Sequence, residues 1–300
     1  MKHKKLNLII VGAQKAGTTS LNNYLRAHPE ISGHKAVEFS FFADPKEYQE
    51  GFDSAYDKLF DCKEQNTLVA KNVTIAFNEA AIARIKEHNP AIKLVFILRE
   101  PVSRAYSAYT MAVKDGWMQR SFAEFREILS SKQYNDIMYR HFIKHGLYAE
   151  QLKTILKYFP SEQLKIYLFE DLKENPQQVC NDIFKWLDLV CIEVAATVHN
   201  STVQPRSIKL GGFLNKLRNN ENPVKKLVKS ILPNALYSNL GNKVQQLNKS
   251  TKRFPAIEND IKEELLEYFE KYNQDLLNQI HQLDHQSLCI FSQDNWLLNQ

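Results

Sequence analysis

The beginning of the chain carries the pattern that most restricts its fold. An apolar run, Leu6–Val11, is followed by a loop that starts at Gly12 and by an amphipathic segment, Thr18–Ala27, which ends at His28 and Pro29. A short run that is apolar almost throughout predicts a parallel strand buried on both faces. A strand, a glycine-bounded loop and a helix in this order predict the first unit of a nucleotide-binding α/β fold.

The same alternation continues along the chain. The apolar runs Lys93–Leu98 and Leu164–Phe169 each follow an amphipathic segment, Asn78–His88 and Ala149–Tyr158 respectively. We therefore expect an α/β, P-loop-like three-layer fold with a central, mostly parallel sheet flanked by helices. Ligands of such folds bind at the carboxyl ends of the strands. Three residues fall at those ends: Gly12, Arg99 and Glu170.

No linker rich in proline, glycine or serine divides the chain, so we expect one domain across residues 1–300. Within it, residues 1–200 are predicted to form the nucleotide-binding core and residues 201–300 a basic, helical C-terminal part. The segment Gly116–His145 is predicted to be helical with aromatic anchors. Ile257–Ile280 has the apolar spacing of one long amphipathic helix.

Positive charge is concentrated in residues 215–253, where nine lysines and arginines face a single acidic residue, Glu221, although the chain as a whole carries only +5. This stretch is either a solvated surface or a contact region for a polyanion or a membrane face. We expect no nucleic-acid partner, and the oligomeric state is left open. No apolar stretch approaches the roughly 20 residues that span a bilayer, and none resembles a signal peptide, so we expect a cytoplasmic protein.

The loop Gly12–Ser20 has the composition of a phosphate-binding site. A helix N-terminus presents unpaired N–H groups to an anion, and here a lysine and three hydroxyls accompany it. An ordinary capped turn is the alternative. A nucleoside triphosphatase loop would place lysine directly after the second glycine, where Thr18 stands, and Lys93–Leu98 ends without the acidic residue that holds Mg²⁺. The four cysteines also lack metal-ligand spacing. We therefore expect a nucleotide with a single 5'-phosphate, and no bound metal.

Two motifs together resemble one family. GAQKAGTTSL at the loop resembles the 5'-phosphosulfate loop of sulfotransferases that use 3'-phosphoadenosine 5'-phosphosulfate (PAPS), and LVFILREPVSRAYSAY at Leu94–Tyr109 resembles their 3'-phosphate segment. HGLYAEQL and FPSEQLKIYLFEDLKENP extend the resemblance over roughly residues 6–190. It implies that PAPS is the donor and adenosine 3',5'-bisphosphate the product, with Lys15 on the 5'-phosphate and bridging oxygen, and Arg99 and Ser107 on the 3'-phosphate. The implied loop contacts are Gly12, Ala13, Gln14, Lys15, Ala16, Gly17, Thr18, Thr19 and Ser20.

The acceptor side is implied by the same resemblance. VEFSFF at residues 37–42 is similar to a stretch of carbohydrate sulfotransferases whose glutamate is the general base, and Glu38 takes that position, although Val37 replaces the usual lysine. Lys71 resembles a lysine that lines the acceptor cleft. Arg206 is a candidate for the 3'-phosphate. Other members of the family use a histidine base, which leaves three further candidates: His34, His141 and His145.

The resemblance implies transfer of a sulfuryl group to a hydroxyl or amine, with a saccharide or glycolipid as the expected acceptor. A protein tyrosine or a small metabolite remains open. Two other classes compete with this hypothesis. One is a P-loop kinase of small hydroxyl compounds, and the other is a non-catalytic binder of nucleotides or polyanions that uses residues 215–253.

Overall fold

The computed structural model describes residues 4–60, 65–195, 203–205, 249–284, 287–291 and 295–298. The chain separates into two compact units. Unit 1 contains residues 1–104, 144–199 and 265–300, and unit 2 contains residues 105–143 and 200–264. Whether the whole chain acts as one domain stays a prediction.

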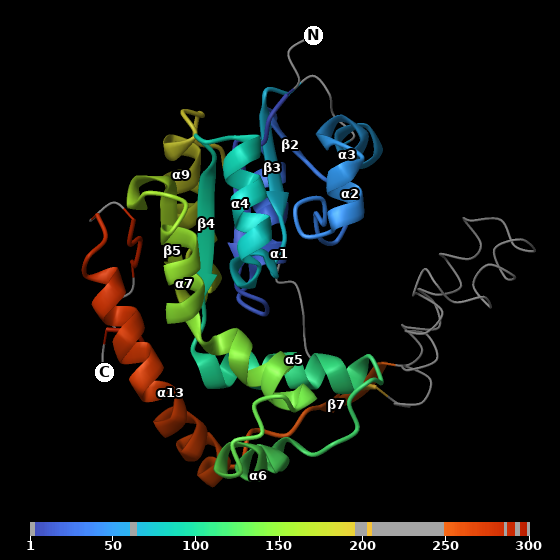
Figure 1. Cartoon of the computed structure of the whole chain (residues 1–300), viewed down its shortest axis with the longest axis vertical. Coiled ribbons are helices and arrows are strands. Elements are labelled where there is room, and N and C mark those ends of the chain that lie inside the picture. The colour runs from blue at the N-terminus through green and yellow to red at the C-terminus, as the bar shows by residue number, and fades with distance from the viewer. Residues whose placement is uncertain are drawn as a thin grey trace, which may run out of the picture. The chain divides into compact units, whose positions relative to one another are not determined.

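The centre of unit 1 is a parallel sheet of five strands in the order β2-β3-β1-β4-β5 (Figure 1). Every residue of β1, β3 and β5 is buried, as expected for parallel strands covered on both faces. The predicted α/β fold is confirmed, and the sheet is parallel throughout. The strands are β1 (Leu8–Gly12), β2 (Ile31–Gly33), β3 (Thr67–Lys71), β4 (Lys93–Leu98) and β5 (Leu164–Leu168).

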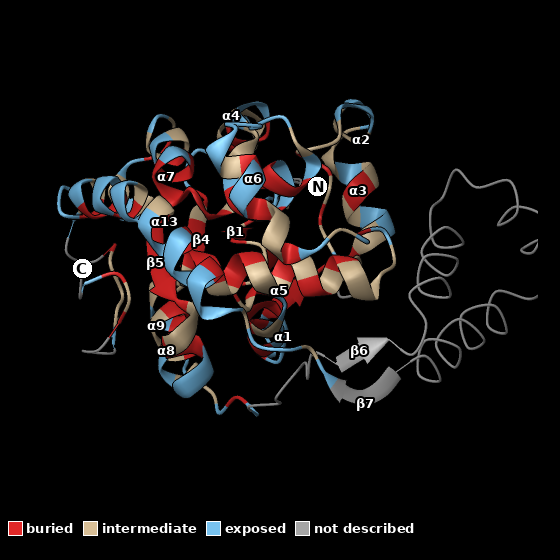
Figure 2. Ribbon diagram, turned by 90° about the horizontal axis from the view of Figure 1, so that it is seen from below, coloured by how far each residue is buried: buried red, intermediate tan, exposed pale blue. Residues whose placement is uncertain are grey.

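Helices cover both faces of this sheet. Figure 2 shows α4 (Glu79–His88) and α7 (Tyr148–Leu156) on one side of the strands, and α1 (Thr18–Arg26), α8 (Phe169–Glu174) and α9 (Pro176–Trp186) on the other. The result is the predicted three layers. Two shorter helices follow β2, namely α2 (Pro45–Gln49) and α3 (Phe52–Leu59), and two 3₁₀ turns precede α4 and β5, namely η1 (Ile75–Phe77) and η5 (Ser161–Gln163).

Side-chain caps start several of these helices where the sequence places them. The Asn78 side chain accepts a hydrogen bond from the Ala81 N–H at the start of α4, and the Asp44 side chain accepts from the first turn of α2. Proline occupies the first position of α2 and of α9, where its fixed φ suits a helix and no N–H is needed.

Unit 2 has its own elements. It contains most of α5 (Pro101–Lys114), the start of α13 (Asn259–Ile280), and an antiparallel pair formed by β6 (Val203–Pro205) and β7 (Lys249–Arg253). The long helix predicted over residues 257–280 is confirmed within two residues at its start and to the residue at its end.

The segment Gly116–His145 differs from the continuous helical segment predicted. It contains four short pieces in two contiguous pairs, with turns between the pairs: η2 (Phe122–Glu124) with α6 (Phe125–Ser130), and η3 (Tyr139–Ile143) with η4 (Lys144–Gly146). Its aromatic residues do not share one helical face, and several pack instead into a cluster in which Phe122 contacts Phe125 at 4.7 Å and Trp117 stacks on Phe142 at 5.7 Å between ring centroids. Ring packing rather than helical periodicity therefore explains their spacing.

Candidate functional site

The motifs singled out in the sequence leave the sheet from the same edge. The register places Ile10 of β1 beside Lys71 of β3, and Gly12 beside Phe96 of β4. Since all three strands are parallel, their carboxyl ends are neighbours, and the segments that follow them start side by side. The glycine loop, Lys71 with the residues after it, and Arg99 are therefore brought together within unit 1.

Two glycines allow the loop to pass close to its neighbours. A Cβ atom at Gly12 would lie 3.0 Å from the Phe96 ring. Gly17 has a φ of +82°, and a Cβ there would lie 3.0 Å from both Phe169 and Leu172. A Cβ at either position would have to push its neighbours back by a few tenths of an ångström, and the positive φ of Gly17 disfavours any other residue there, so the loop geometry favours glycine at both positions.

The loop ends at the start of α1. Gly17 is the N-cap, and no side chain caps this helix in the part of the chain that the structure describes. Thr18 is buried, Thr19 is exposed and Ser20 is half-buried. Lys15 stands inside the loop with a φ of +70°. A helix start without a capping side chain keeps its first N–H groups available for an anion, and its dipole favours negative charge there.

Arg99 connects the second motif to the loop. Its guanidinium donates a hydrogen bond to the Lys15 carbonyl at 3.0 Å and lies over the Phe169 ring, 4.5 Å from its centroid. The Tyr148 hydroxyl donates to the Arg99 carbonyl at 2.8 Å. Burial lowers the pKa of the Arg99 side chain, an effect opposed by the nearby Tyr148 and Glu170. Arginine stays protonated at neutral pH under such a shift, so the edge of the sheet carries a fixed positive charge.

Glu38 and Lys71 form an ion pair that the sequence did not predict. The Lys71 ammonium, whose side chain is 2% exposed, lies 2.6 Å from Glu38 Oε1, and the Glu38 side chain is 32% exposed. The Val73 N–H donates to Glu38 Oε2 at 3.0 Å. Both carboxylate oxygens therefore accept hydrogen bonds, one from a side chain and one from the backbone, and these hold the carboxylate in place.

The phenylalanines beside Glu38 do not surround its carboxylate. Phe39, Phe41 and Phe42 are buried and pack on one another, with ring centroids 5.0 to 6.0 Å apart, whereas Val37 is 79% exposed. The VEFSFF stretch lies in a bend followed by a turn. Its apolar residues anchor the bend to the core, and this leaves Glu38 beside Lys71 at the surface of unit 1.

The three histidine candidates lie in different surroundings. His34 is fully buried and its Nε2 accepts a hydrogen bond from the Lys71 N–H, and burial together with the Lys71 charge lowers the pKa of this imidazole to about 4. His141 is exposed, packs on Trp117, and has its pKa lowered by burial of part of the ring. His145 stacks on Phe77 at 4.3 Å, and its Nδ1 lies 3.4 Å from Gln14 Oε1 of the loop. His145 is the histidine that lies against the loop.

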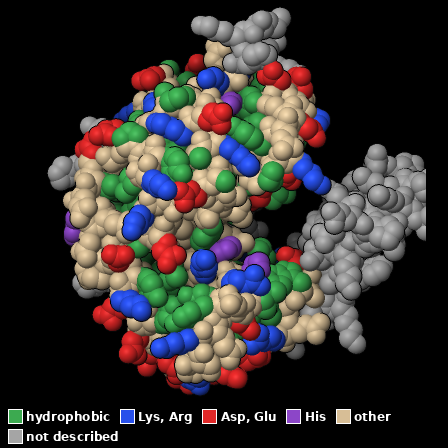
Figure 3. All heavy atoms as spheres, viewed as in Figure 1, with side chains coloured by type: hydrophobic (Ala, Val, Ile, Leu, Met, Phe, Trp, Pro, Cys, Tyr) green, Lys and Arg blue, Asp and Glu red, His purple; other side chains and the backbone are tan. Residues whose placement is uncertain are grey.

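Two predicted nucleotide contacts are less fully described. Ser107 lies in the second turn of α5, is half-buried, and its carbonyl accepts a hydrogen bond from the Thr110 hydroxyl at 3.1 Å. Arg206 lies outside the described residues, as do positions 215–248 of the basic stretch. The surface that can be followed in Figure 3 has acidic and basic side chains interspersed over the face that it shows.

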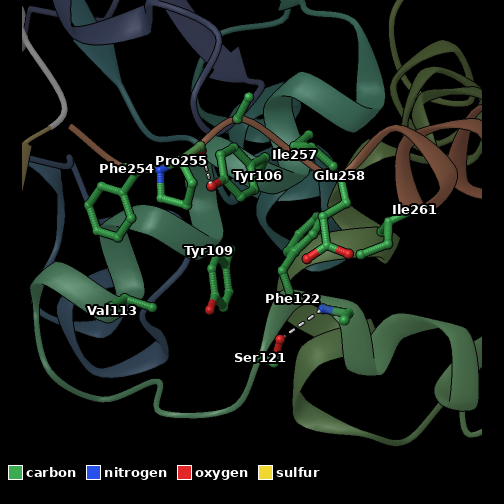
Figure 4. Close-up of a pocket in the computed structure, with 12 residues that line it drawn as sticks. Tyr106, Tyr109, Val113, Ser121, Phe122, Phe254, Pro255, Ile257, Glu258 and Ile261 are labelled. Atoms are coloured by element: carbon green, nitrogen blue, oxygen red, sulfur yellow. Dashed lines mark hydrogen bonds between the residues drawn. The ribbon is translucent and has the colours of Figure 1, made fainter.

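Unit 2 contains a separate pocket of about 330 Å³ (Figure 4). Tyr106, Tyr109 and Phe122 line it together with residues 254–258 and Ile261. The Tyr106 hydroxyl donates to the Pro255 carbonyl, which ties that segment to α5. None of the site residues predicted from the sequence lines this pocket, so the candidate chemistry stays at the sheet edge of unit 1.

A three-layer fold around a parallel sheet, with a glycine-bounded loop and an arginine at the carboxyl edge of that sheet, defines the class of P-loop-like nucleotide-binding proteins. Comparison with known proteins identifies the family within this class. The model of the sulfotransferase domain family matches residues 5–281. The chain belongs to the sulfotransferase domain family, whose members generally use PAPS.

The curated relatives are sulfotransferases of heparan sulfate. The chain is 28% identical over 196 residues to "Bifunctional heparan sulfate N-deacetylase/N-sulfotransferase 1" of Caenorhabditis briggsae, a match that covers 61% of the chain and 22% of that protein. It is 27% identical over 183 residues to "Heparan sulfate glucosamine 3-O-sulfotransferase 5" of Mus musculus, which covers 60% of the chain and 53% of that protein. The matched part of the chain thus spans between about a fifth and a half of the length of these relatives.

A solved structure agrees over more of the chain. A sulfotransferase from Alicyclobacillus acidocaldarius is 25% identical with a TM-score of 0.65, and the match covers 94% of this chain and 98% of that one.

The expected cytoplasmic location is wrong, because the curated relatives are heparan sulfate enzymes, which do not act in the cytoplasm. None of the described helices is long and apolar enough to cross a membrane. Among the described residues, no group of three or more His, Cys, Asp or Glu side chains is placed to hold a metal ion.

Proposed function

We propose that this chain transfers the sulfuryl group of PAPS to a hydroxyl or amine of a saccharide or glycolipid. The observation that carries the proposal is the meeting of three elements at one edge of the sheet: the loop with its uncapped helix start, Arg99 bonded to that loop, and the Glu38–Lys71 ion pair. The heparan sulfate relatives support a saccharide as the acceptor.

In this proposal the donor binds through its two ends. The loop residues Gly12–Ser20 hold the 5'-phosphosulfate on the N–H groups at the start of α1, with Lys15 on the bridging oxygen. Arg99 holds the 3'-phosphate, and Ser107 and Arg206 remain further contacts predicted from the sequence. An arginine can grip a phosphate through two parallel N–H bonds, which fixes its orientation as well as its position.

The transfer itself breaks one bond to sulfur and forms another. The acceptor oxygen or nitrogen attacks sulfur in line, the bond between sulfur and the bridging phosphate oxygen breaks, and adenosine 3',5'-bisphosphate leaves with the electron pair. Lys15 and the loop amides stabilise the negative charge that develops on the leaving oxygen. Glu38 takes the acceptor's proton. Lys71 donates a hydrogen bond to Glu38 and holds its carboxylate in place before the reaction starts.

A screen of acceptor classes with labelled PAPS tests the proposal. Saccharides, glycolipids, a tyrosine peptide and small alcohols are each incubated with the full chain, PAPS and EDTA, and labelled product is separated from donor. We expect label on a saccharide or glycolipid without added metal. Binding of adenosine 3',5'-bisphosphate and of ATP is measured in parallel by calorimetry. Tighter binding of ATP together with an absolute Mg²⁺ requirement would identify a kinase instead, and nucleotide binding without any transfer would identify a non-catalytic binder.

A further inference from the structure

A groove opens beside Glu38 on the surface of unit 1. It has a volume of about 600 Å³. One wall is the turn that leads into α2, and the other is the segment that follows β3. The lining residues are Glu38, Ser40, Ala43, Asp44, Pro45, Lys46, Asn72 and Thr74. Because it contains the proposed base, this groove is where an acceptor would place its reacting hydroxyl.

The hydroxyl groups of the groove already donate hydrogen bonds to other groups of the chain. The Ser40 hydroxyl donates to Glu47 Oε2 at 2.7 Å, and the Thr74 hydroxyl donates to Asn72 Oδ1 at 2.7 Å. The Asn72 amide donates to the Phe39 carbonyl at 3.0 Å. A hydroxyl whose one hydrogen already takes part in a hydrogen bond can only accept a further hydrogen bond. These hydroxyls therefore offer oxygen lone pairs to a ligand.

The charged groups of the groove do not favour an anionic ligand either. Its described lining contains two carboxylates, Glu38 and Asp44, and one ammonium, the exposed Lys46. The nearby Lys71 is already paired with Glu38 at 2.6 Å. One Asp44 oxygen accepts from the N–H groups of Lys46 and Glu47. Counted with Lys71, two carboxylates and two ammonium groups balance, so the groove has no excess of positive charge to attract an anionic ligand, and its oxygen lone pairs favour a ligand that donates hydrogen bonds.

We propose that the acceptor is an uncharged or amine-bearing polyol, that is, a neutral glycan or an amino sugar, and not a sulfated or carboxylated polysaccharide. This inference rests on the proposed function. Sugar hydroxyls and ammonium groups donate to the lone pairs that Ser40, Asp44 and Thr74 present, and the reacting hydroxyl donates to Glu38. Sulfate and carboxylate groups can only accept hydrogen bonds, and apart from the Lys46 ammonium and the second Asn72 amide hydrogen the described side chains of the groove offer them lone pairs and carboxylates.

The test compares three acceptors on the full chain with saturating PAPS at one ionic strength. They are a neutral N-acetylglucosamine oligosaccharide, a glucosamine oligosaccharide with free amines, and heparosan, an unsulfated polysaccharide with a carboxylate on every second sugar. We expect kcat/KM to be at least tenfold higher for one of the first two than for heparosan. Equal or faster sulfation of heparosan overturns the inference. The inference is also overturned if the protein binds adenosine 3',5'-bisphosphate in calorimetry but sulfates neither the N-acetylglucosamine nor the glucosamine oligosaccharide. A protein that does not bind this nucleotide contradicts the proposed function instead.

A charge variant locates the preference in the groove. Asp44→Asn removes one carboxylate and keeps a side chain that caps α2 well. We expect it to raise KM for the glucosamine oligosaccharide about fivefold, a larger factor than for the neutral oligosaccharide, and to leave nucleotide affinity unchanged. Asp57→Asn removes the same charge from α3 outside the groove and serves as the matched control. An unchanged KM for the amine acceptor in Asp44→Asn, or an equal rise in both variants, contradicts the assignment of the groove.

Discussion

Replacement of Glu38 by glutamine is expected to have two separable effects. The carboxylate accepts one hydrogen bond from the Lys71 ammonium and another from the Val73 N–H. Glutamine has a single oxygen, so one of these donors must face its NH₂ group. The Lys71 side chain is 2% exposed, and its charge then lacks an ionised partner.

The size of the stability effect follows from burial. Loss of a hydrogen bond to a charged group costs about 1.5 to 3 kcal/mol, and removal of one member of a fully buried pair costs about 3 to 5 kcal/mol. Glu38 is about a third exposed, and water can replace part of what is lost. We therefore expect Glu38→Gln to lower the free energy of unfolding by about 2 kcal/mol and turnover by about 10² to 10⁴.

A second substitution separates these effects. Lys71→Met removes the buried ammonium, so the double variant Glu38→Gln, Lys71→Met should return to within about 1 kcal/mol of the parent in urea unfolding, because no buried charge is then left unpaired. Its turnover should stay low. If the double variant recovers turnover together with stability, Glu38 is the structural partner of Lys71 and not the base. Parent-like stability of Glu38→Gln alone would show that the ion pair contributes little to folding.

Three further outcomes are expected. At about 100 times its dissociation constant, adenosine 3',5'-bisphosphate should stabilise the fold by roughly 2.7 kcal/mol in EDTA, measured by urea unfolding, and no stabilisation contradicts the site. Arg99→Ala should weaken binding of this nucleotide by about 1.5 to 3 kcal/mol in calorimetry, more than Glu38→Gln does, and unchanged binding would make Arg99 a structural residue. Burial lowers the folded-state pKa of His34 and of His88 to about 4, below the ordinary value of 6.5, so the unfolded chain binds more protons between these limits. The stability that these two histidines contribute is present above pH 6.5 and is lost as the pH falls toward 4, by about 2 kcal/mol each at pH 5, and an unfolding free energy that is flat between pH 7.5 and 5 contradicts their burial as neutral rings.

The strands that the sequence predicted are those whose apolar run is long enough to stand out. Lys93–Leu98 is β4 as predicted, and Leu164–Phe169 ends one residue later than β5. β2 and β3 were not predicted, because β2 has three residues and β3 ends in a lysine that reads as exposed. Lys71 is buried where β3 runs inside the sheet and the bend with Glu38 and Phe39 contacts its end, and its own sequence indicates neither contact.

The site was predictable as a set of motifs and not as a set of contacts. The nine loop positions and Arg99 were identified from motifs that resemble those of one family, but the bond between Arg99 and the Lys15 carbonyl depends on how β4 ends beside β1. The Glu38–Lys71 pair joins residues 33 positions apart through a bend, and periodicity carries no information about such a bend. His34 was left open as a base, and only the structure shows its Nε2 accepting from a backbone N–H.

The hydrogen bond from Arg99 to the loop carbonyl has a consequence for nucleotide choice. It fixes the guanidinium relative to the loop before any nucleotide arrives, so the distance between the two proposed anion-binding positions is set by the folded chain. Binding then loses little conformational entropy at these residues. A ligand with phosphates at both the 3' and 5' positions of its ribose can match that distance, whereas a linear triphosphate places its charge along one direction only. We expect the chain to select its nucleotide by the separation of two charges, and to do so more strictly than a loop with a mobile arginine.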